Sequence, residues 1–274
     1  MKRYGKIASI LLAFIIILSL LLSNTLTGLF EVTAVSVFDS FYKNSIKNII
    51  NKEDEIKLPR VEKKDFVTKK IFQTHEKIDL IPGYYIKNLK KINPDYEYVF
   101  HDSKERVDFI QKYYGKKFVD KMNSFKRGAH KADLWRLCVL YKYGGCYIDA
   151  DLVMQIPFDE VIDKCQQKLI IPQTELPMDK KRIFNALIMC NPGNELIGKC
   201  LKKIMLVDQK NLTYHYHFII QLMGEILKNK IKYNIIEKCI HKHNINLYLS
   251  NPDNFYVTFR DNTIIAKSKR SDYI

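Results

Sequence analysis

From Val67 onward the chain alternates between two spacings of apolar residues. Short apolar runs bounded by turn residues predict strands, and apolar residues three and four apart predict helices. The predicted strands are 70–73, 96–100, 169–171 and 184–190, with a hairpin of 255–259 and 263–266. The predicted helices are 83–92, 103–123, 129–143, 195–206 and 214–228. This alternation is typical of an α/β domain.

The amino end has a different pattern. Residues 7–30 carry no charge and follow Lys2, Arg3 and Lys6. A membrane span needs about 20 apolar residues, and basic flanks stay in the cytosol. We therefore expect a cytosolic tail (1–6), a transmembrane signal anchor (7–30), a stem (31–65) and a folded domain (66–274), in a single-pass type II arrangement. The alternative is a cleaved signal peptide, with Ala34-Val-Ser36 as its small-residue site.

The composition is globular and basic. Hydrophobic residues make up 47% of the chain, and 45 basic against 30 acidic residues give a net charge of +15. The basic residues are scattered and form no stripe interleaved with aromatics, so a nucleic-acid partner is not expected. A positive surface also suits anionic membrane lipids or a phosphorylated acceptor.

The most informative segment is Tyr147-Ile-Asp149-Ala-Asp151, which follows the pair Gly144-Gly145. Alternate side chains of a strand share a face, so the two carboxylates are expected to point the same way. Hard oxygen ligands of this kind suit Mn²⁺ or Mg²⁺, and such ions keep open positions for substrate phosphates. A nucleotide diphosphate is a ligand of that kind.

Asp133 and Arg136 interrupt the apolar pattern of the preceding helix. Residues three apart lie on one stripe of a helix. One interpretation is an internal ion pair at the helix surface. The other is a carboxylate and a guanidinium aimed at the hydroxyls of a bound sugar, close to the metal.

These residues occur in an ordered set. Arg127, Lys131-Ala-Asp133-Leu-Trp-Arg136, Gly144-Gly145 and Asp149-Ala-Asp151 together resemble the core signature of the DXD-motif glycosyltransferases of family 32. That family includes initiating mannosyltransferases and inositol-phosphoceramide mannosyltransferases. The resemblance runs from about 67 to about 199, with 69–75 similar to the opening strand and 184–193 similar to the segment after the metal motif.

The resemblance implies a GT-A-like, Rossmann-type nucleotide-sugar-binding domain behind an N-terminal transmembrane helix. It implies a metal-dependent, retaining glycosyltransferase that moves a sugar from GDP-mannose or a UDP-sugar to a glycan or glycolipid acceptor. In a eukaryote the catalytic domain would lie in the Golgi or ER lumen.

The same resemblance assigns roles to residues. Asp149 and Asp151 are expected to hold the metal, and both are expected to be catalytic together with Asp133 and Arg136. The residues expected to bind the donor are Gln73, Thr74, Arg127, Asp133, Arg136, Tyr147, Asp149 and Asn185.

The chain also departs from the family. Phe72 replaces the usual His, His75 replaces the usual Trp, and the residues after Lys199 lack the closing motifs. A catalytically silent relative that binds glycans or stabilises a partner enzyme is therefore the alternative function. The pairs His215/His217 and His241/His243 are interpreted as lying outside a metal site, because i, i+2 rings diverge on a helix and the second pair lies in a polar stretch.

Six cysteines show no Cys-x-x-Cys, so a zinc site is not expected. In an oxidising lumen they would allow 15 pairings, which the sequence does not rank. Cys138 and Cys146 lie in apolar contexts and are expected to be buried thiols. The sequon Asn211-Leu-Thr213 permits N-glycosylation without establishing it.

Overall fold

The computed structural model describes residues 40, 42–53, 55–174, 182–228, 230, 235–239, 255–259, 261 and 263–268. The chain divides into two compact units, 1–52 and 53–274. In the first unit, residues 42–51 are helical. The expected membrane anchor, 7–30, lies outside the described residues. Within the described part of the chain, no helix combines the length and the apolar character needed to cross a membrane.

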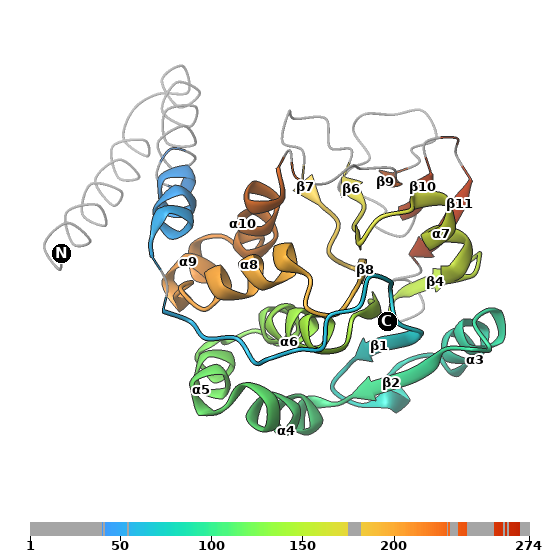
Figure 1. Ribbon diagram of the computed structural model, residues 1–274, viewed down its shortest axis with the longest axis horizontal. Coiled ribbons are helices and arrows are strands. Elements are labelled where there is room, and N and C mark those ends of the chain that lie inside the picture. Colours follow the sequence, from blue (N-terminus) through green and yellow to red (C-terminus); the bar gives the residue numbers. More distant parts are fainter. Residues whose placement is uncertain are drawn as a thin grey trace, which may run out of the picture. The chain divides into compact units, whose positions relative to one another are not determined.

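The second unit contains a five-stranded sheet with the strand order β2-β1-β3-β8-β5, of which β2, β1 and β8 are labelled in Figure 1. β1 pairs in parallel with both β2 and β3, whereas β8 runs antiparallel between β3 and β5. The carboxyl ends of the three parallel strands therefore meet at one edge, where open α/β sheets bind ligands. The strands are β1 (Lys70–Thr74), β2 (Glu97–His101), β3 (Gly145–Ile148), β5 (Leu169–Ile170) and β8 (Leu187–Cys190).

A second sheet of six strands has the order β4-β11-β10-β9-β6-β7. β10 and β11 pair antiparallel, which confirms the predicted C-terminal hairpin strands. β4 follows β3 in the chain and pairs with β11, so the segment between β3 and β4 joins the two sheets. The strands are β4 (Leu152–Met154), β6 (Gln173–Thr174), β7 (Arg182–Ile183), β9 (Ile235–Cys239), β10 (Phe255–Phe259) and β11 (Ile264–Ser268).

Helices surround the five-stranded sheet. Figure 1 shows α6 near the middle of this unit, where it contacts β1, β3 and α8, with α4 and α5 nearby. The α-helices are α3 (Gly83–Ile92), α4 (Ser103–Tyr114), α5 (Lys116–Ser124), α6 (Gly128–Tyr143), α7 (Phe158–Cys165), α8 (Glu195–Ile204), α9 (Gln209–Tyr214) and α10 (Phe218–Leu227); η1 (Ile78–Leu80) is a 3₁₀ turn.

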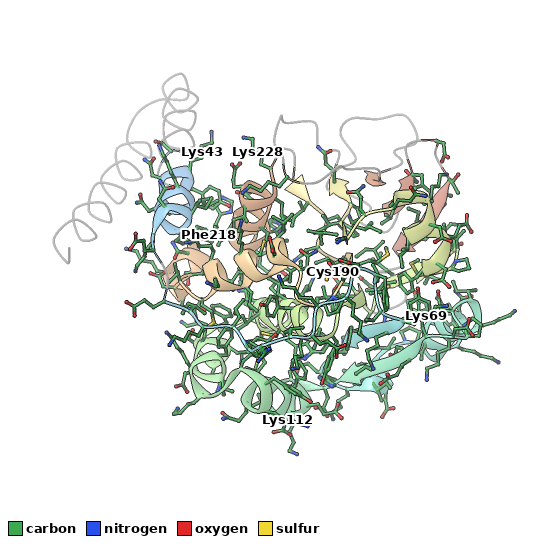
Figure 2. All side chains as sticks on the ribbon, viewed as in Figure 1. Lys43, Lys69, Lys112, Cys190, Phe218 and Lys228 are labelled. Carbon is green, nitrogen blue, oxygen red and sulfur yellow. The ribbon has the colours of Figure 1, made fainter. Side chains whose placement is uncertain are left out.

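Helix α6 is buried on all sides along 133–140, not on the single face that its spacing predicts. The spacing predicts a buried stripe of Leu134, Leu137, Cys138 and Tyr141, but Trp135 and Val139, which lie off that stripe, are also fully buried. A helix that is apolar all round belongs in the interior of a domain. Figure 2 shows the same inside-outside division, with Cys190 in the interior and Lys69 and Lys112 at the periphery.

Two predicted helices are wrong in extent. The predicted helix 103–123 is two helices, because Gly115 has φ 79° and ends α4 in a backbone conformation that only glycine adopts freely. The predicted helix 214–228 begins only at Phe218, because residues 215–217 form the connection between α9 and α10.

The Gly144-Gly145 pair lets α6 reverse directly into β3. Both residues have positive φ, 64° and 93°. A Cβ atom on Gly145 would lie 2.6 Å from the carbonyl oxygen of Lys70, at the start of β1. These two positions therefore require glycine for backbone conformation and for close strand approach, and they fix where β3 delivers its last residues.

Candidate active site

The two aspartates of the motif lie in a turn between β3 and β4, not in the strand itself. The amide of Asp149 donates to the carbonyl of Ala186 (2.8 Å), and the amide of Leu152 donates to the carbonyl of Asp149 (3.2 Å). Strand alternation therefore does not set the direction of the two side chains. The prediction that both aspartates lie in the strand is wrong. Asp149 and Asp151 are partly exposed, whereas their neighbours Ile148, Ala150 and Leu152 are buried.

Arg136 is the centre of a buried polar cluster. Its Nη1 donates to the carbonyl oxygen of Asn185 (2.5 Å), and its Nη2 lies 3.3 Å from Oδ1 of Asp133 and 3.4 Å from Oδ1 of Asp149. Its guanidinium carbon stands 4.3 Å from the ring centroid of Tyr147. The structure thus brings together five residues that the sequence predicts for the site, from α6, β3 and the segments that follow β3 and precede β8.

The charge of Arg136 is retained although the side chain is only 6% exposed. Burial alone would lower its pKa, but interaction with Tyr147 and with the carboxylates of Asp149, Asp133 and Asp151 outweighs burial and raises the pKa. Asp151 therefore lies within electrostatic range of the same guanidinium. Arg136 stays protonated and neutralises part of the acidic cluster.

Asp133 forms an ion pair with Arg136, but the pair is buried and not on a helix surface. Oδ1 of Asp133 also accepts a hydrogen bond from Nδ2 of Asn185 (2.9 Å). Burial raises the pKa of Asp133, while Arg136 and His130 act in the opposite direction. The expected ion pair between Asp133 and Arg136 is therefore present. It lies in the interior, next to the aspartate turn.

Among the described residues, the side chain of Asp149 is held through one of its two oxygens. The hydroxyl of Tyr147 donates to Oδ1 of Asp149, the same oxygen that faces Arg136. Burial raises the pKa of Tyr147, so its hydroxyl remains a proton donor at neutral pH. Both of these contacts use Oδ1, and the side chain is 33% exposed, so Oδ2 is the oxygen that can accept a ligand.

Gln73 and Thr74, at the carboxyl end of β1, are buried. Nε2 of Gln73 donates to the carbonyl of Asp149 (3.4 Å), and its Oε1 accepts from the hydroxyl of Tyr98 (2.9 Å). Thr74 donates to the carbonyl of His101 (2.6 Å). Gln73 therefore supports the aspartate turn, whereas Thr74 connects β1 to the end of β2.

Arg127 lies apart from the cluster around Arg136. It precedes the first residue of α6, and its guanidinium carbon stands 5.0 Å from the ring centroid of Tyr216. His130, one turn into α6, contacts the carbonyl of Tyr216 through Nε2 (3.0 Å). The loop that carries His215 and His217 thus reaches the start of α6. His241 and His243 lie outside the described residues.

Sequence reasoning missed two polar contacts near the carboxyl ends of β1 and β2. The indole of Trp135 donates to Nδ1 of His101 (3.1 Å). Arg106, on α4, is 3% exposed and binds the end of β1. Trp135 could have been noticed as the single tryptophan of the chain, but Arg106 has no sequence signal, because it stands in a helix with many charged residues.

A metal ion would find two protein carboxylates at this turn. Within the described ranges, no group of three or more His, Cys, Asp or Glu side chains is placed to hold a metal. Two carboxylates fit Mg²⁺ or Mn²⁺, because these ions are often held by one or two carboxylates and take their other ligands from phosphates and water. The same set does not fit a structural zinc ion, which needs four protein ligands.

A cavity of about 430 Å³ lies elsewhere on the unit. Its walls include Lys70 and Glu97, the first residues of β1 and β2, and Tyr143, the last residue of α6. None of the predicted site residues lines it. The five cysteines whose side chains are described, at positions 138, 146, 165, 190 and 200, are buried free thiols, as expected for Cys138 and Cys146.

The chain was compared with known proteins. Residues 83–168 match the family described as "Glycosyltransferase sugar-binding region containing DXD motif". The chain is 30% identical over 129 residues to the mannosyl phosphorylinositol ceramide synthase SUR1 of Saccharomyces cerevisiae, covering 46% of this chain and 30% of that protein. It is 36% identical over 66 residues to the inositol phosphoceramide mannosyltransferase 3 of Schizosaccharomyces pombe, covering 24% of this chain and 18% of that protein.

The chain therefore spans less than a third of the length of either relative. Among solved structures, the PaToxG glycosyltransferase is similar, with a TM-score of 0.41 and 16% identity over 72% of this chain and 78% of that chain. The matched range 83–168 contains α6, the glycine pair and the aspartate turn. Through these residues, the chain is similar to the DXD-motif glycosyltransferases.

Proposed function

We propose that the protein is a metal-dependent, retaining glycosyltransferase that moves a sugar from a nucleotide diphosphate donor to a glycan or glycolipid acceptor. The observation that carries the proposal is the placement of Arg136 between Asp133 and Asp149, beside the aspartate turn at the carboxyl edge of the parallel strands. That edge is where α/β sheets bind nucleotides.

The domain of 66–274 would then be a GT-A-like catalytic domain. Three features support this proposal: the parallel order β2-β1-β3, the metal-type turn directly after β3, and the crossing from that turn into a second sheet. Residues 7–30 would anchor it in a membrane as a type II protein, because they are uncharged and follow a basic flank.

Asp149 and Asp151 would hold Mn²⁺ or Mg²⁺ against the donor diphosphate. When bound, such an ion neutralises the charge that develops on the leaving diphosphate. The chain's own contribution is to orient Asp149: Tyr147 and Arg136 fix Oδ1, and Gln73 fixes the backbone carbonyl. These contacts would hold the side chain of Asp149 in one orientation, so that it would not need to rearrange during the reaction.

Asp133 and Asn185 would contact the hydroxyls of the donor sugar. Their mutual hydrogen bond and the ion pair to Arg136 hold both groups rigidly next to the turn. The two curated relatives are named as enzymes of inositol phosphoceramide mannosylation. GDP-mannose is therefore the first donor to test, UDP-sugars are the next, and a glycolipid is the first acceptor.

The second candidate function is a catalytically silent, glycan-binding or partner-stabilising relative. The observation that favours it is the burial of Asp133, which is 7% exposed and already contacts Arg136 and Asn185. A group satisfied in this way is compatible with a purely structural role.

The experiment that separates the two functions is nucleotide release. The full chain is incubated with Mn²⁺ and a panel of GDP- and UDP-sugars, with and without a glycolipid acceptor, and released GDP or UDP is measured. Turnover of one donor that is lost in Asp151→Asn supports the transferase. Asp120→Asn is the matched control, because Asp120 is an exposed aspartate paired with Lys116 on α5. No turnover of any donor would favour the silent relative.

A further inference from the structure

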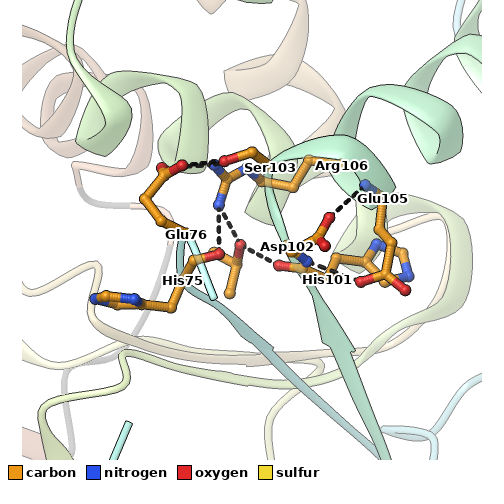
Figure 3. Close-up of polar contacts among 8 residues, drawn as sticks. His75, Glu76, His101, Asp102, Ser103, Glu105 and Arg106 are labelled. Atoms are coloured by element: carbon orange, nitrogen blue, oxygen red, sulfur yellow. Dashed lines mark hydrogen bonds and ion pairs between the residues drawn. The ribbon is translucent and has the colours of Figure 1, made fainter. Parts of the chain in front are cut away.

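Arg106 is a buried charge that the proposed chemistry does not use. It lies on α4 and is 3% exposed. Its Nη1 donates to Oγ1 of Thr74 (2.5 Å) and to the carbonyl of His75 (3.4 Å). Its Nη2 donates to Oε1 of Glu76 (3.0 Å) and to Oγ of Ser103 (3.1 Å). Figure 3 shows this guanidinium surrounded by its acceptors.

The acceptors belong to two segments that follow neighbouring parallel strands. Thr74 ends β1, and His75 and Glu76 come directly after it, while Ser103 starts α4 after β2. Ser103 also donates to Oε2 of Glu76, so the two segments are joined both directly and through Arg106. One guanidinium therefore holds the segment that follows β1 (the post-β1 segment, residues 75–77) to the start of α4.

The start of α4 is itself fixed. Asp102 and Glu105 form a capping box, in which each side chain accepts from the backbone amide of the other (2.8 Å and 2.9 Å; Figure 3). The capping box fixes the first turn of α4, and therefore fixes the positions from which the side chains of Ser103 and Arg106 reach the neighbouring segment.

The held segment adjoins the candidate site. β1, β2 and β3 are parallel, so residues 75–76 leave the sheet at the same edge as Asp149. Oε1 of Glu76 would lie 3.3 Å from a Cβ atom on Gly128, the first residue of α6. The post-β1 segment therefore lies against the start of the helix that carries Asp133 and Arg136.

Stability alone gives a weak reason for a charge at this position. The side chain of Arg106 is 4% exposed, whereas that of its partner Glu76 is 59% exposed, so the pair is unevenly desolvated. Replacing buried ion pairs with apolar groups is often neutral or stabilising, and a retained buried charge can instead specify one arrangement. A guanidinium suits this task, because its planar fork directs several hydrogen bonds at once.

We propose that Arg106 is a positioning residue that fixes residues 75–77 as one wall of the donor site. It sets the affinity for the nucleotide donor through the order of this segment and does not touch the reacting atoms. This inference rests on the proposed function, because it assigns the wall to the donor.

The test compares Arg106→Lys with Ile110→Val in the full chain. Lysine keeps the positive charge of Arg106 but lacks the planar guanidinium that directs several hydrogen bonds at once. Ile110 lies on the same helix, is fully buried and has an apolar side chain, so its shortening lowers stability and leaves the hydrogen-bonding groups of Arg106 in place. Glu76→Gln is a third variant, which keeps an acceptor oxygen for Arg106 and removes the charge.

Two readouts are needed: hydrogen exchange of the amides of residues 75–77 without ligand, and steady-state kinetics with the donor. In Arg106→Lys we expect exchange of these amides about tenfold faster, because the segment opens more often. We expect the donor KM to rise about tenfold, as it would if only about a tenth of the molecules held the segment in place, with kcat changed less than about twofold. Ile110→Val should lower Tm and leave both readouts unchanged, and Glu76→Gln should give a smaller change than Arg106→Lys.

Unchanged exchange in Arg106→Lys would overturn the proposal, as would a loss confined to kcat or a KM change no larger than that of Ile110→Val. Failure of the proposed function is recognised separately, by a parent protein that turns over no donor and binds neither GDP nor UDP. In that case faster exchange in Arg106→Lys would show that Arg106 orders the segment, and the assignment of the segment to a donor site would be overturned.

Discussion

Nη2 of Arg136 lies 3.4 Å from Oδ1 of Asp149, and this contact joins the buried helix α6 to the turn that follows β3. The same nitrogen is 3.3 Å from Asp133. One buried cation therefore links two carboxylates that come from different elements of the fold.

Removing this cation should be costly. In Arg136→Met the buried carboxylate of Asp133 loses its partner, and breaking a buried pair from one side costs about 3–5 kcal/mol. We expect the free energy of unfolding, measured by urea denaturation, to fall by that amount. The double variant Asp133→Asn/Arg136→Met should recover part of the loss, because the unpaired charge is gone. A single-variant loss below about 1 kcal/mol would contradict the described network.

The titration of Asp133 gives a pH-dependent prediction. Burial raises the pKa of Asp133 above its usual 3.8. In the window between these two pKa values the folded state binds a proton that the unfolded state has released, so this group's contribution to stability falls as pH rises through the window. Asp133→Asn does not titrate and serves as the reference.

The measurement is the free energy of unfolding of the parent and of Asp133→Asn at several pH values upward from 3.8. We expect the stability of the parent relative to the variant to decrease with rising pH and then to level off. A relative stability that increases over the same range would mean that attraction to Arg136 outweighs burial and that the pKa is lowered.

The glycine turn before β3 gives a prediction about the backbone. Gly145→Ala places a Cβ atom 2.6 Å from the carbonyl of Lys70 at a residue with φ 93°. Strained backbone of this kind costs about 1–3 kcal/mol before the clash is added. We expect a loss of at least about 2 kcal/mol in urea denaturation. Gly83→Ala is the matched control, because a Cβ atom there meets nothing within 4 Å, and it should change stability by no more than about 0.5 kcal/mol.

The sequence predicted the parts of the fold that depend on local pattern. The strands at 70–73 and 255–259 and the helix 83–92 were found because their apolar spacing and boundary residues act locally. The break at Gly115 was missed because the apolar spacing continues across it, although a glycine in a helical pattern is a known stop signal. The order of strands in the two sheets depends on contacts between distant residues, which a single sequence does not reveal.

The sequence predicted which residues belong to the candidate site better than it predicted how they are arranged. Asp133, Arg136, Asp149 and Asn185 were named from spacing and resemblance, and the structure brings them into contact. The turn at Asp149–Asp151 was predicted as a strand, because a short apolar run does not show at which residue the pairing with neighbouring strands ends. Arg106 was missed because its role arises only when the ends of β1 and β2 come together.

The central claim is that Asp149 and Asp151 bind a nucleotide diphosphate through a divalent cation, and calorimetric titration of GDP and UDP tests it most directly. The full chain is titrated with and without Mn²⁺, beside Asp149→Asn, Asp151→Asn and the control Asp120→Asn. We predict that the parent and the control bind one of the nucleotides only with Mn²⁺, and that both turn variants lose at least about tenfold in affinity, the factor that corresponds to about 1.4 kcal/mol. Equal affinity with and without Mn²⁺, or binding unaffected by either turn variant, would contradict the claim.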